Sequence, residues 1–185
     1  MRRRNHNFLL KLEFLCYNLS MKKQAKGIIE KAKIEDYKEV VHLFNELFEV
    51  LVKCNPKKFT PLKEGEVTLQ QKDFEDSLKE GAWRNFELYK IDGKIVALID
   101  YAIYDTSNYP GYIPCKLCML GNIVVKKEYR GMGIGTQCIN YLRQKCKDQN
   151  IQRFELEMEK ANKAAFKFYK KLGLKEERIR FAQYF

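Results

Sequence analysis

The sequence has no run of apolar residues that approaches the roughly 20 needed for a membrane-spanning helix, and it has only two histidines to complement its cysteines in a zinc site. His6 and His42 are the two histidines, and they lie far apart in the chain. Cys115 and Cys118 form the one C-x-x-C pair among six cysteines, whereas a structural zinc site needs a second ligand pair at a short spacing. We therefore expect no membrane partner and no metal site.

Acidic residues are also fewer than basic ones, with 24 Asp and Glu against 35 Lys and Arg and a formal net charge of +11. A basic surface can meet an anionic ligand, a nucleic acid or an acidic partner. The lysines are scattered rather than clustered, however, which is typical of a solvated surface and makes a nucleic-acid partner the less favoured interpretation. A homodimer is left open. The lack of an export signal predicts reduced cysteines and a cytoplasmic location.

The N-terminal 20 residues read differently from the rest of the chain. Lys11 and Glu13 interrupt a weakly apolar stretch, which makes a poor signal peptide and a poor anchor. Met21 begins a segment that reads as a natural start. We expect residues 1–20 to form an N-terminal extension outside the core and residues 21–185 to form one domain, since 185 residues suit a single core.

Apolar periodicity predicts the first helices. From Ile34 to Leu51 apolar residues recur every three or four positions, which is typical of one amphipathic helix, and Asn55-Pro56 should end it. A second amphipathic helix is expected around residues 68–79. These predictions place two helices early in the chain.

Strand signals precede and follow those helices. Two β-rich runs flank Asp92-Gly93, a turn pair that tolerates positive φ, so residues 86–104 should form a hairpin. The remaining expected elements are a strand at 27–33, a loop at 105–114, a strand at 116–125, a helix through Ile139, Leu142 and Cys146, a strand at 153–159, a helix at 162–172 and one or two strands in 174–185. This order predicts a mixed α/β layer fold.

The stretch EYRGMGIGTQ lies between an expected strand and an expected helix, and it places Gly131, Gly133 and Gly135 within five residues. Glycine lets the backbone approach a ligand closely, and the first amides of a helix attract anions. The G-x-G-x-G spacing differs from the dinucleotide fingerprint G-x-G-x-x-G, and the ATP-loop lysine is missing. On the residues alone, a phosphate cradle and a structural turn both remain open.

Two motifs carry a resemblance to a known family. YRGMGIGTQCINYL resembles the R/Q-x-x-G-x-G/A signature of the GNAT superfamily of acyl-CoA N-acetyltransferases, with Arg130, Gly133 and Gly135 at its fixed places. ELEMEKANKAAFKFYKKLGL resembles the late strand and N-x-x-A-x-x-x-Y-x-K-x-G-F/L helix of that family, and it is nearest the branch that acetylates protein N-termini, including ribosomal-protein alanine acetyltransferases. The resemblance implies a single-domain α/β fold with a mixed, mostly antiparallel sheet of six or seven strands flanked by about four helices.

The resemblance also implies acetyl-CoA as co-substrate, bound between the strand that ends at Val125 and the strand at 153–159. Its pantetheine arm would pair with strand backbone, and its pyrophosphate would meet the amides of the glycine stretch. By the resemblance, Asn162 would lie near the pantetheine and thiol end of the cofactor. Asn162 also suits a helix N-cap, and the two roles are compatible. The implied cofactor-binding residues are Ile123, Val124, Val125, Arg130, Gly131, Met132, Gly133, Ile134, Gly135, Thr136 and Asn162.

Two residues are candidates for catalysis by their match to the family. Tyr169 is the candidate acid, although its place on an apolar helix face also suits a core residue. Glu157 is the candidate base, and a solvated acidic strand face is its structural alternative. Many family members carry an acid on the preceding strand, where this sequence has Gly121 and Asn122. Gly121 suits a β-bulge, and a water relay or an already neutral amine could replace a side-chain base.

The resulting hypothesis is acetyl transfer from acetyl-CoA to a primary amine by direct attack. The acceptor is either a peptide or protein N-terminus or a small molecule, and its cleft is expected at the loops of residues 54–66 and 105–114, with Tyr109 and Tyr112. The positive charge argues against a polycationic acceptor. The alternative is a GNAT-like module that binds CoA or nucleic acid without turnover.

Overall fold

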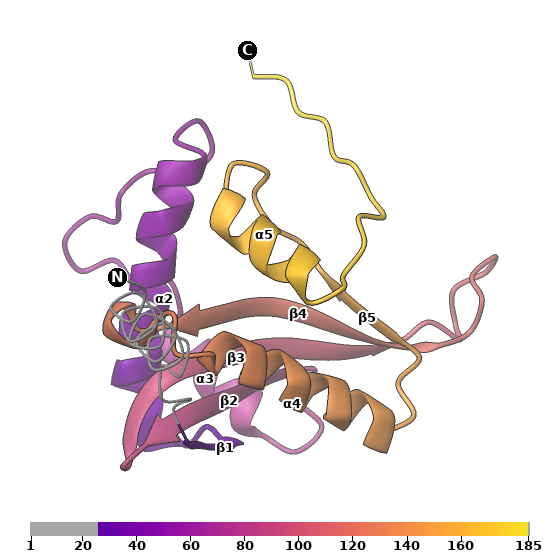
Figure 1. The fold of residues 1–185 in the computed structure, drawn as a ribbon, viewed down its shortest axis with the longest axis horizontal. Helices are drawn as coiled ribbons and strands as arrows, with labels where there is room; N and C mark the ends of the chain where they lie inside the picture. The colour runs from indigo at the N-terminus through magenta and orange to yellow at the C-terminus, as the bar shows by residue number, and fades with distance from the viewer. Residues whose placement is uncertain (1–25, 185) are drawn as a thin grey trace, which may run out of the picture.

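The computed structural model describes residues 26–184, so the expected extension at 1–20 lies outside the described residues. Figure 1 shows one sheet with helices packed on both of its faces. The elements are β1 (Ile28–Lys31), η1 (Ile34–Asp36), α2 (Tyr37–Cys54), α3 (Gln71–Leu78), β2 (Arg84–Ile91), β3 (Lys94–Asp105), β4 (Lys116–Val125), η2 (Lys127–Tyr129), α4 (Ile134–Asp148), β5 (Arg153–Leu156) and α5 (Lys163–Lys171).

The sheet follows the order of its strands along the chain, β1-β2-β3-β4-β5. The first three pairings are antiparallel and β4 pairs with β5 in parallel, so the sheet is mixed and mostly antiparallel. The α/β class and the four α-helices seen in residues 26–184 confirm the prediction. The strand count differs, because this part of the chain holds five strands instead of six or seven.

The hairpin between β2 and β3 turns where the sequence predicts. Asp92 has φ 49° and Gly93 has φ 75°, which are the two consecutive positive values that a tight two-residue hairpin turn requires. This turn sets the register of β2 against β3, the two strands with the longest stretches of buried side chains.

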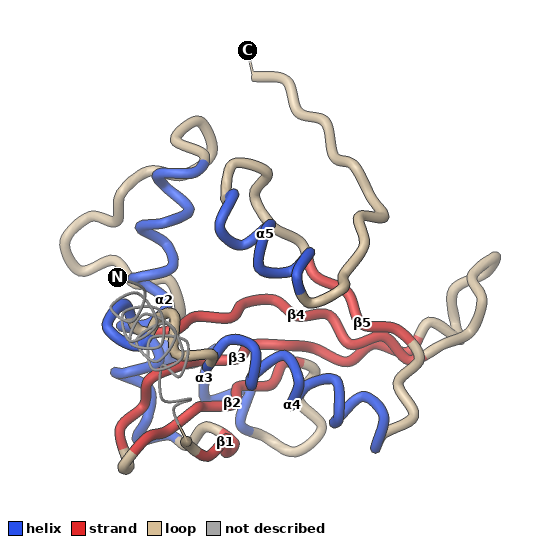
Figure 2. Tube along the Cα trace, in the orientation of Figure 1, coloured by secondary structure: helices blue, strands red, loops and turns tan. Residues whose placement is uncertain are grey.

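Alternating side chains divide the core into two layers. On one face of the sheet α2 and α3 cover a cluster that includes Phe86, Leu98 and Val124. On the other face α4 and α5 cover a cluster that includes Ile99 and Leu120. Figure 2 shows the helices distributed around the strands in this way. Among residues 26–184, no helix combines the length and the apolar character needed to cross a bilayer.

The C-terminal segment departs from the prediction of one or two further strands. Residues 175–184 have no strand, and they run as an extended segment beside α5 and β5 (Figure 1). Their contacts with the domain include side-chain ion pairs, such as Arg153 with Glu177 at 2.9 Å and Arg180 with Glu157 at 3.5 Å. Residues 175–180 read KEERIR, and such charged side chains are better solvated than packed, which explains why the segment remains outside the sheet.

Candidate active site

The strands β4 and β5 separate partway along their length. They pair from Leu117 with Arg153 to Leu120 with Leu156, and β5 ends there while β4 continues to Val125. The last four residues of β4 therefore pair with β3 on one side and have no strand beside them on the other within residues 26–184. An open strand edge presents backbone donors and acceptors to a ligand. The predicted contacts Ile123, Val124 and Val125 all lie in this open stretch.

A β-bulge marks the point of separation. Asp100 pairs with Asn122 and Tyr101 pairs with Leu120, so Gly121 is the extra residue of β4. A β-bulge bends a strand and increases its local twist, which accounts for the divergence of β4 from β5. The predicted bulge at Gly121 is confirmed.

The bulge lies against a buried carboxylate. A Cβ atom added at Gly121 would lie 3.1 Å from Oδ2 of Asp100. Arg84 donates two hydrogen bonds of 2.8 Å to the Asp100 carboxylate, and Nδ2 of Asn122 donates a third at 2.6 Å. Asp100 is 3% exposed. Arg84, Asp100 and Asn122 are called the Asp100 cluster below, and its bonds fix the amide of Asn122 beside the open part of β4.

The glycine loop joins the open strand to α4. Gly131 and Gly133 each have φ 79°, a left-handed conformation that disfavours other residues. Gly133 is the N-cap of α4, and no side chain caps this end of the helix. Gly135 serves another purpose, because a Cβ there would lie 3.2 Å from Cζ of Phe168 on α5. Two glycines therefore shape the turn, and the third lets α5 approach α4.

The backbone amides of Ile134, Gly135 and Thr136 form the first turn of α4, where helix geometry leaves amides without intrahelical partners. Ile134 is fully buried and anchors this turn in the core, whereas Met132 is exposed beside it. The helix dipole adds positive potential at the same place. The turn has the geometry to bind a phosphate or diphosphate group.

The side chain of Arg130 contacts β4 and α2. Its Nε donates a 2.8 Å hydrogen bond to the carbonyl of Val125, and one terminal nitrogen lies 3.5 Å from Glu46 of α2. Its backbone amide donates to the carbonyl of Lys127. Arg130 therefore braces the loop against the end of β4, and the predicted backbone contact at this residue has less support than those in the first turn of α4.

Asn162 begins α5 as its N-cap. Its Oδ1 accepts a 3.1 Å hydrogen bond from the amide of Ala165, which confirms the capping interpretation. Because Oδ1 is the capping atom, Nδ2 is the atom that could face a ligand. The cap fixes the first turn of the helix that carries Tyr169.

Tyr169 packs against the core layer beneath α4 and α5. Its ring lies 5.1 Å from that of Phe168. Burial raises the pKa of Tyr169 to about 12. Within the described part of the chain, no hydrogen-bond partner is found for its hydroxyl. Tyr169 is half-buried, and residues 26–184 contain no fully buried side-chain oxygen that lacks a partner, so its hydroxyl keeps some access to solvent.

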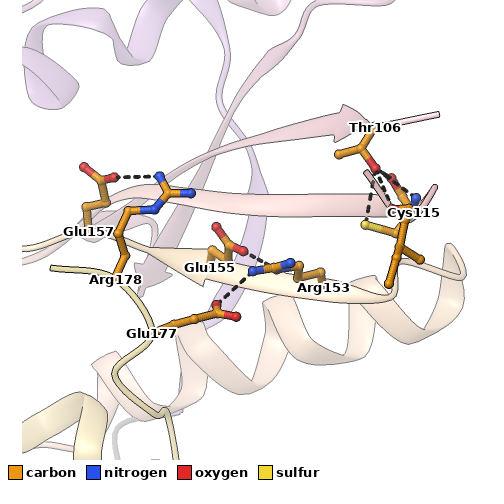
Figure 3. Close-up of polar contacts among 8 residues, drawn as sticks. Thr106, Cys115, Arg153, Glu155, Glu157, Glu177 and Arg178 are labelled. Carbon is orange, nitrogen blue, oxygen red and sulfur yellow. Dashed lines mark hydrogen bonds and ion pairs between the residues drawn. The ribbon is translucent and has the colours of Figure 1, made fainter. Parts of the chain in front are cut away.

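Glu157 lies one residue beyond β5, in the connection to α5, and its side chain is 58% exposed. Its carboxylate is 4.0 Å from Arg178 and 3.5 Å from Arg180 of the C-terminal segment. Figure 3 shows Glu157 facing Arg178, with Glu155 bound to Arg153 further back along β5. The structure thus shows both the solvated acidic face that the sequence left open and a basic segment next to the candidate base.

A pocket of about 410 Å³ lies beside the Asp100 cluster on the face of the sheet covered by α2. Its lining residues are Phe44, Leu47, Phe48, Leu51, Leu62, Val67, Thr68, Arg84 and Asn122. The loop after α2 contributes to it, as the sequence suggests. The second expected loop does not line this pocket: Asp105 and Pro114 line a separate hollow of about 320 Å³ with Asn150 and Gln152, and the rings of Tyr109 and Tyr112 contact each other.

The sequence interpretation missed Arg84 and Asp100. A signal was present, because Asp100 interrupts the run IVALIDYAIY, and a carboxylate within a strand buried on both faces needs a partner. The identity of that partner depends on strand register, which places Arg84 opposite Ala102 and next to Asp100. Register is a property of the fold, so the partner could not be identified from residue spacing.

The cysteines of the C-x-x-C pair separate in the structure. Cys118 is buried and interacts with Cys146, whereas Cys115 is half-buried beside Thr106 (Figure 3). Over residues 26–184, no three His, Cys, Asp or Glu side chains come together in a group that could hold a metal ion.

Comparison with known proteins agrees with the family resemblance of the two motifs. Residues 44–174 match the sequence model of the Acetyltransferase (GNAT) family. This match spans more than half of the chain, and the chain therefore belongs to the GNAT family of acetyltransferases. Members of this family take their acetyl group from acetyl-CoA.

The individual proteins that match this chain are similar to it over a short segment or at low sequence identity. A segment of 54 residues is 44% identical to the uncharacterized N-acetyltransferase YobR of Bacillus subtilis, and it covers 29% of this chain and 22% of that protein. The tetramutant of the BH1408 protein from Bacillus halodurans has a TM-score of 0.77 at 24% identity, covering 85% of this chain and 99% of that chain. Glucosamine-6-phosphate N-acetyltransferase from Arabidopsis thaliana has a TM-score of 0.59 at 21% identity, covering 86% and 99%. At these identities the solved structures show the shared fold alone.

Proposed function

We propose that this chain transfers an acetyl group from acetyl-CoA to a primary amine by direct attack. The observation that carries the proposal is the separation of β4 from β5, which leaves Ile123–Val125 as an open edge leading directly to the uncapped first turn of α4. An extended arm can pair with such an edge, and a diphosphate can bind such a turn. The cytoplasmic location and the homodimer stay predictions.

The residues present fit the acetyl donor. Gly131 and Gly133 hold left-handed conformations, and Glu128 is the one acidic residue between Lys126 and Arg143 along the chain. Glu46 of α2 also lies near this loop, 3.5 Å from Arg130, whose positive charge offsets it. The amides of Ile134 and Thr136 would bind the diphosphate, with Gly135 between them. Acetyl-CoA supplies a thioester, whose carbonyl carbon is activated towards an amine. The Gly121 bulge lets a backbone amide near Ile123 point towards that carbonyl.

Tyr169 would hold a proton at its hydroxyl for the leaving sulfur. Its pKa of about 12 lies well above the pKa of a thiol, about 8.5. Complete proton transfer from the phenol is therefore uphill, and a hydrogen bond to the developing negative charge is the more favourable contribution. The proton left on sulfur comes from the attacking nitrogen once the amide has formed.

Glu157 is the proposed base, acting directly or through a water. It lies one residue beyond β5, at the end of the strand where β4 and β5 separate. Arg178 and Arg180 must release its carboxylate before it can accept a proton. An amine that arrives neutral would need no base.

A charge at the first turn of α4 tests the donor site. Thr136→Glu places a carboxylate near the helix N-terminus, which favours the helix by about 0.3–1 kcal/mol, but repels a diphosphate. We expect unchanged or higher thermal stability and a loss of CoA affinity of about 100-fold, measured by calorimetry. Thr136→Gln is the matched control and should bind CoA nearly normally. Equal CoA affinity in both variants would remove α4 from the proposed site.

A second candidate function is CoA binding without turnover. It is favoured by the ion pairs that hold Glu157 and by the neutral residues Gly121 and Asn122 on β4. Release of the free thiol in the presence of an amine panel separates the two functions, because a binding module consumes no thioester. Nucleic-acid binding is a less favoured form of this candidate, and it should weaken steeply with added salt.

A further inference from the structure

Six of the nine side chains that line the pocket beside the Asp100 cluster are apolar. Leu47, Phe48 and Leu51 of α2 are half-exposed apolar side chains that line it, with Leu62 and Val67 opposite them in the next loop. A volume of about 410 Å³ lies within the range of about 300–1,000 Å³ that is usual for small-molecule sites. The walls can bind an apolar body by removing it from water.

The charge in the pocket is already balanced. Arg84 is the one ionisable residue among the lining side chains, and Asp100 pairs with both of its donor groups at 2.8 Å. None of the lining residues is an aspartate or a glutamate. A second positive charge on an acceptor would enter this space without a partner, which is costly. The pocket therefore opposes polycations and accepts an uncharged body.

The loop after α2 is bonded to the connection that precedes α5, and it contacts Phe48 of the pocket lining. Glu159, in the connection from β5 to α5, bonds to Asn55 at 3.0 Å and to Lys58 at 2.8 Å. Phe59 packs edge-on against Phe48 at 5.7 Å. These contacts tie the loop after α2 to the connection that follows β5, so a long peptide cannot cross there without breaking them.

Asn122 links this pocket to the proposed chemistry. It lines the pocket and directly precedes the open stretch Ile123–Val125. We propose, on the basis of the acetyltransferase reaction proposed above, that the acceptor is a small primary amine with an apolar body and no second charge. The body fills the pocket, and the nitrogen lies at the Asn122 end, next to the thioester.

An acceptor panel tests this proposal. The amines are 2-phenylethylamine, the polyamine spermidine and a short peptide with an N-terminal alanine, with acetyl transfer followed by thiol release and by mass. We expect 2-phenylethylamine to have a kcat/KM about 10- to 100-fold above both others, the gain from burying a phenyl group. Binding of 2-phenylethylamine in the presence of CoA, followed by ligand NMR, gives a readout that does not depend on turnover.

The acceptor panel separates a wrong acceptor class from a wrong reaction. If spermidine or the peptide is preferred, the acceptor class is wrong while the acetyltransferase function stands. If acetyl-CoA binds but none of the amines is acetylated, the proposed reaction fails and this inference fails with it.

A pair of adjacent substitutions on α2 locates the site. Leu51 lines the pocket and Val52 does not, because neighbouring residues of a helix point about 100° apart. Leu51→Glu should lower kcat/KM for 2-phenylethylamine at least tenfold and abolish its NMR-detected binding, while CoA affinity remains unchanged. Val52→Glu carries the same added charge and should retain wild-type values. Equal effects of the two variants would place the acceptor elsewhere.

Discussion

Two carboxylates on opposite faces of the sheet are both buried and both paired with a basic side chain, but the residues around each pair differ. Asp100 is 3% exposed and pairs with Arg84, and Glu87 is 5% exposed and pairs with Lys145 at 2.7 Å. Tyr101 also donates a 3.1 Å hydrogen bond to Glu87. In both clusters a basic side chain that is about one-quarter exposed compensates the buried acid.

The surroundings beyond each pair differ. The Lys145 ammonium lies 5.6 Å and 5.5 Å from the ring centres of Tyr101 and Tyr141, so aromatic rings adjoin that pair on the α4 face. Arg84 and Asn122 instead line the pocket on the α2 face. A buried ion pair is thus a poor indicator of function by itself, and the neighbouring pocket is what distinguishes the Asp100 cluster from the Glu87 cluster.

Among the substitutions considered, truncating either buried acid should have the largest effect on the free energy of unfolding. Asp100→Ala and Glu87→Ala each leave a basic side chain without its partner, which should lower the free energy of unfolding by about 3–5 kcal/mol in urea denaturation. Only Asp100→Ala should also raise the KM for the amine, because it frees the amide of Asn122. CoA affinity should be unchanged in both variants.

Apolar double variants provide the control. Replacing both partners with apolar residues, as in Arg84→Met with Asp100→Leu and in Lys145→Met with Glu87→Leu, should recover most of the lost stability. If Glu87→Ala raised the amine KM as much as Asp100→Ala, the two clusters would not differ in function.

Two tyrosines on the α4 face extend the comparison to catalysis. The hydroxyl of Tyr101 bonds to Glu87, whereas no partner for the hydroxyl of Tyr169 is found in residues 26–184. Tyr169→Phe should lower kcat about 100-fold with CoA affinity and melting temperature unchanged. Tyr101→Phe should do the reverse, with a stability loss of about 1 kcal/mol and normal turnover. A normal kcat for Tyr169→Phe would exclude it from the mechanism.

Local signals in the sequence were sufficient for most of the fold. Helical periodicity placed α2 within three residues of its observed start, and the positive-φ pair Asp92-Gly93 placed the β2–β3 turn. The strand predicted at 153–159 ends at Leu156, because its pairing stops where β4 bulges at Gly121. That boundary depends on a neighbouring strand, and local periodicity carries no information about it.

The parts of the candidate site that depend on local backbone conformation could be predicted from the sequence. Gly131 and Gly133 have the positive φ values that their positions suggested, and Asn162 caps α5. The partners of Asp100 and the charged contacts of Glu157 were not predictable, since Arg84 and Arg178 reach them through strand register and the path of the C-terminal segment. Contacts between distant segments are fixed only by the complete fold.

Two alanine substitutions at the closely packed glycines should have the smallest effects and separate the two halves of the site. At Gly121 the new Cβ would press on Asp100, which three hydrogen bonds hold in place, so Gly121→Ala should cost about 1–2 kcal/mol and raise the amine KM about tenfold. At Gly135 the new Cβ would meet the far end of the Phe168 ring, which can shift with α5. Gly135→Ala should cost less stability and weaken CoA instead. Because both variants add one methyl group, a shared loss of CoA affinity with unchanged amine KM would show that the Asp100 cluster has no part in binding the acceptor.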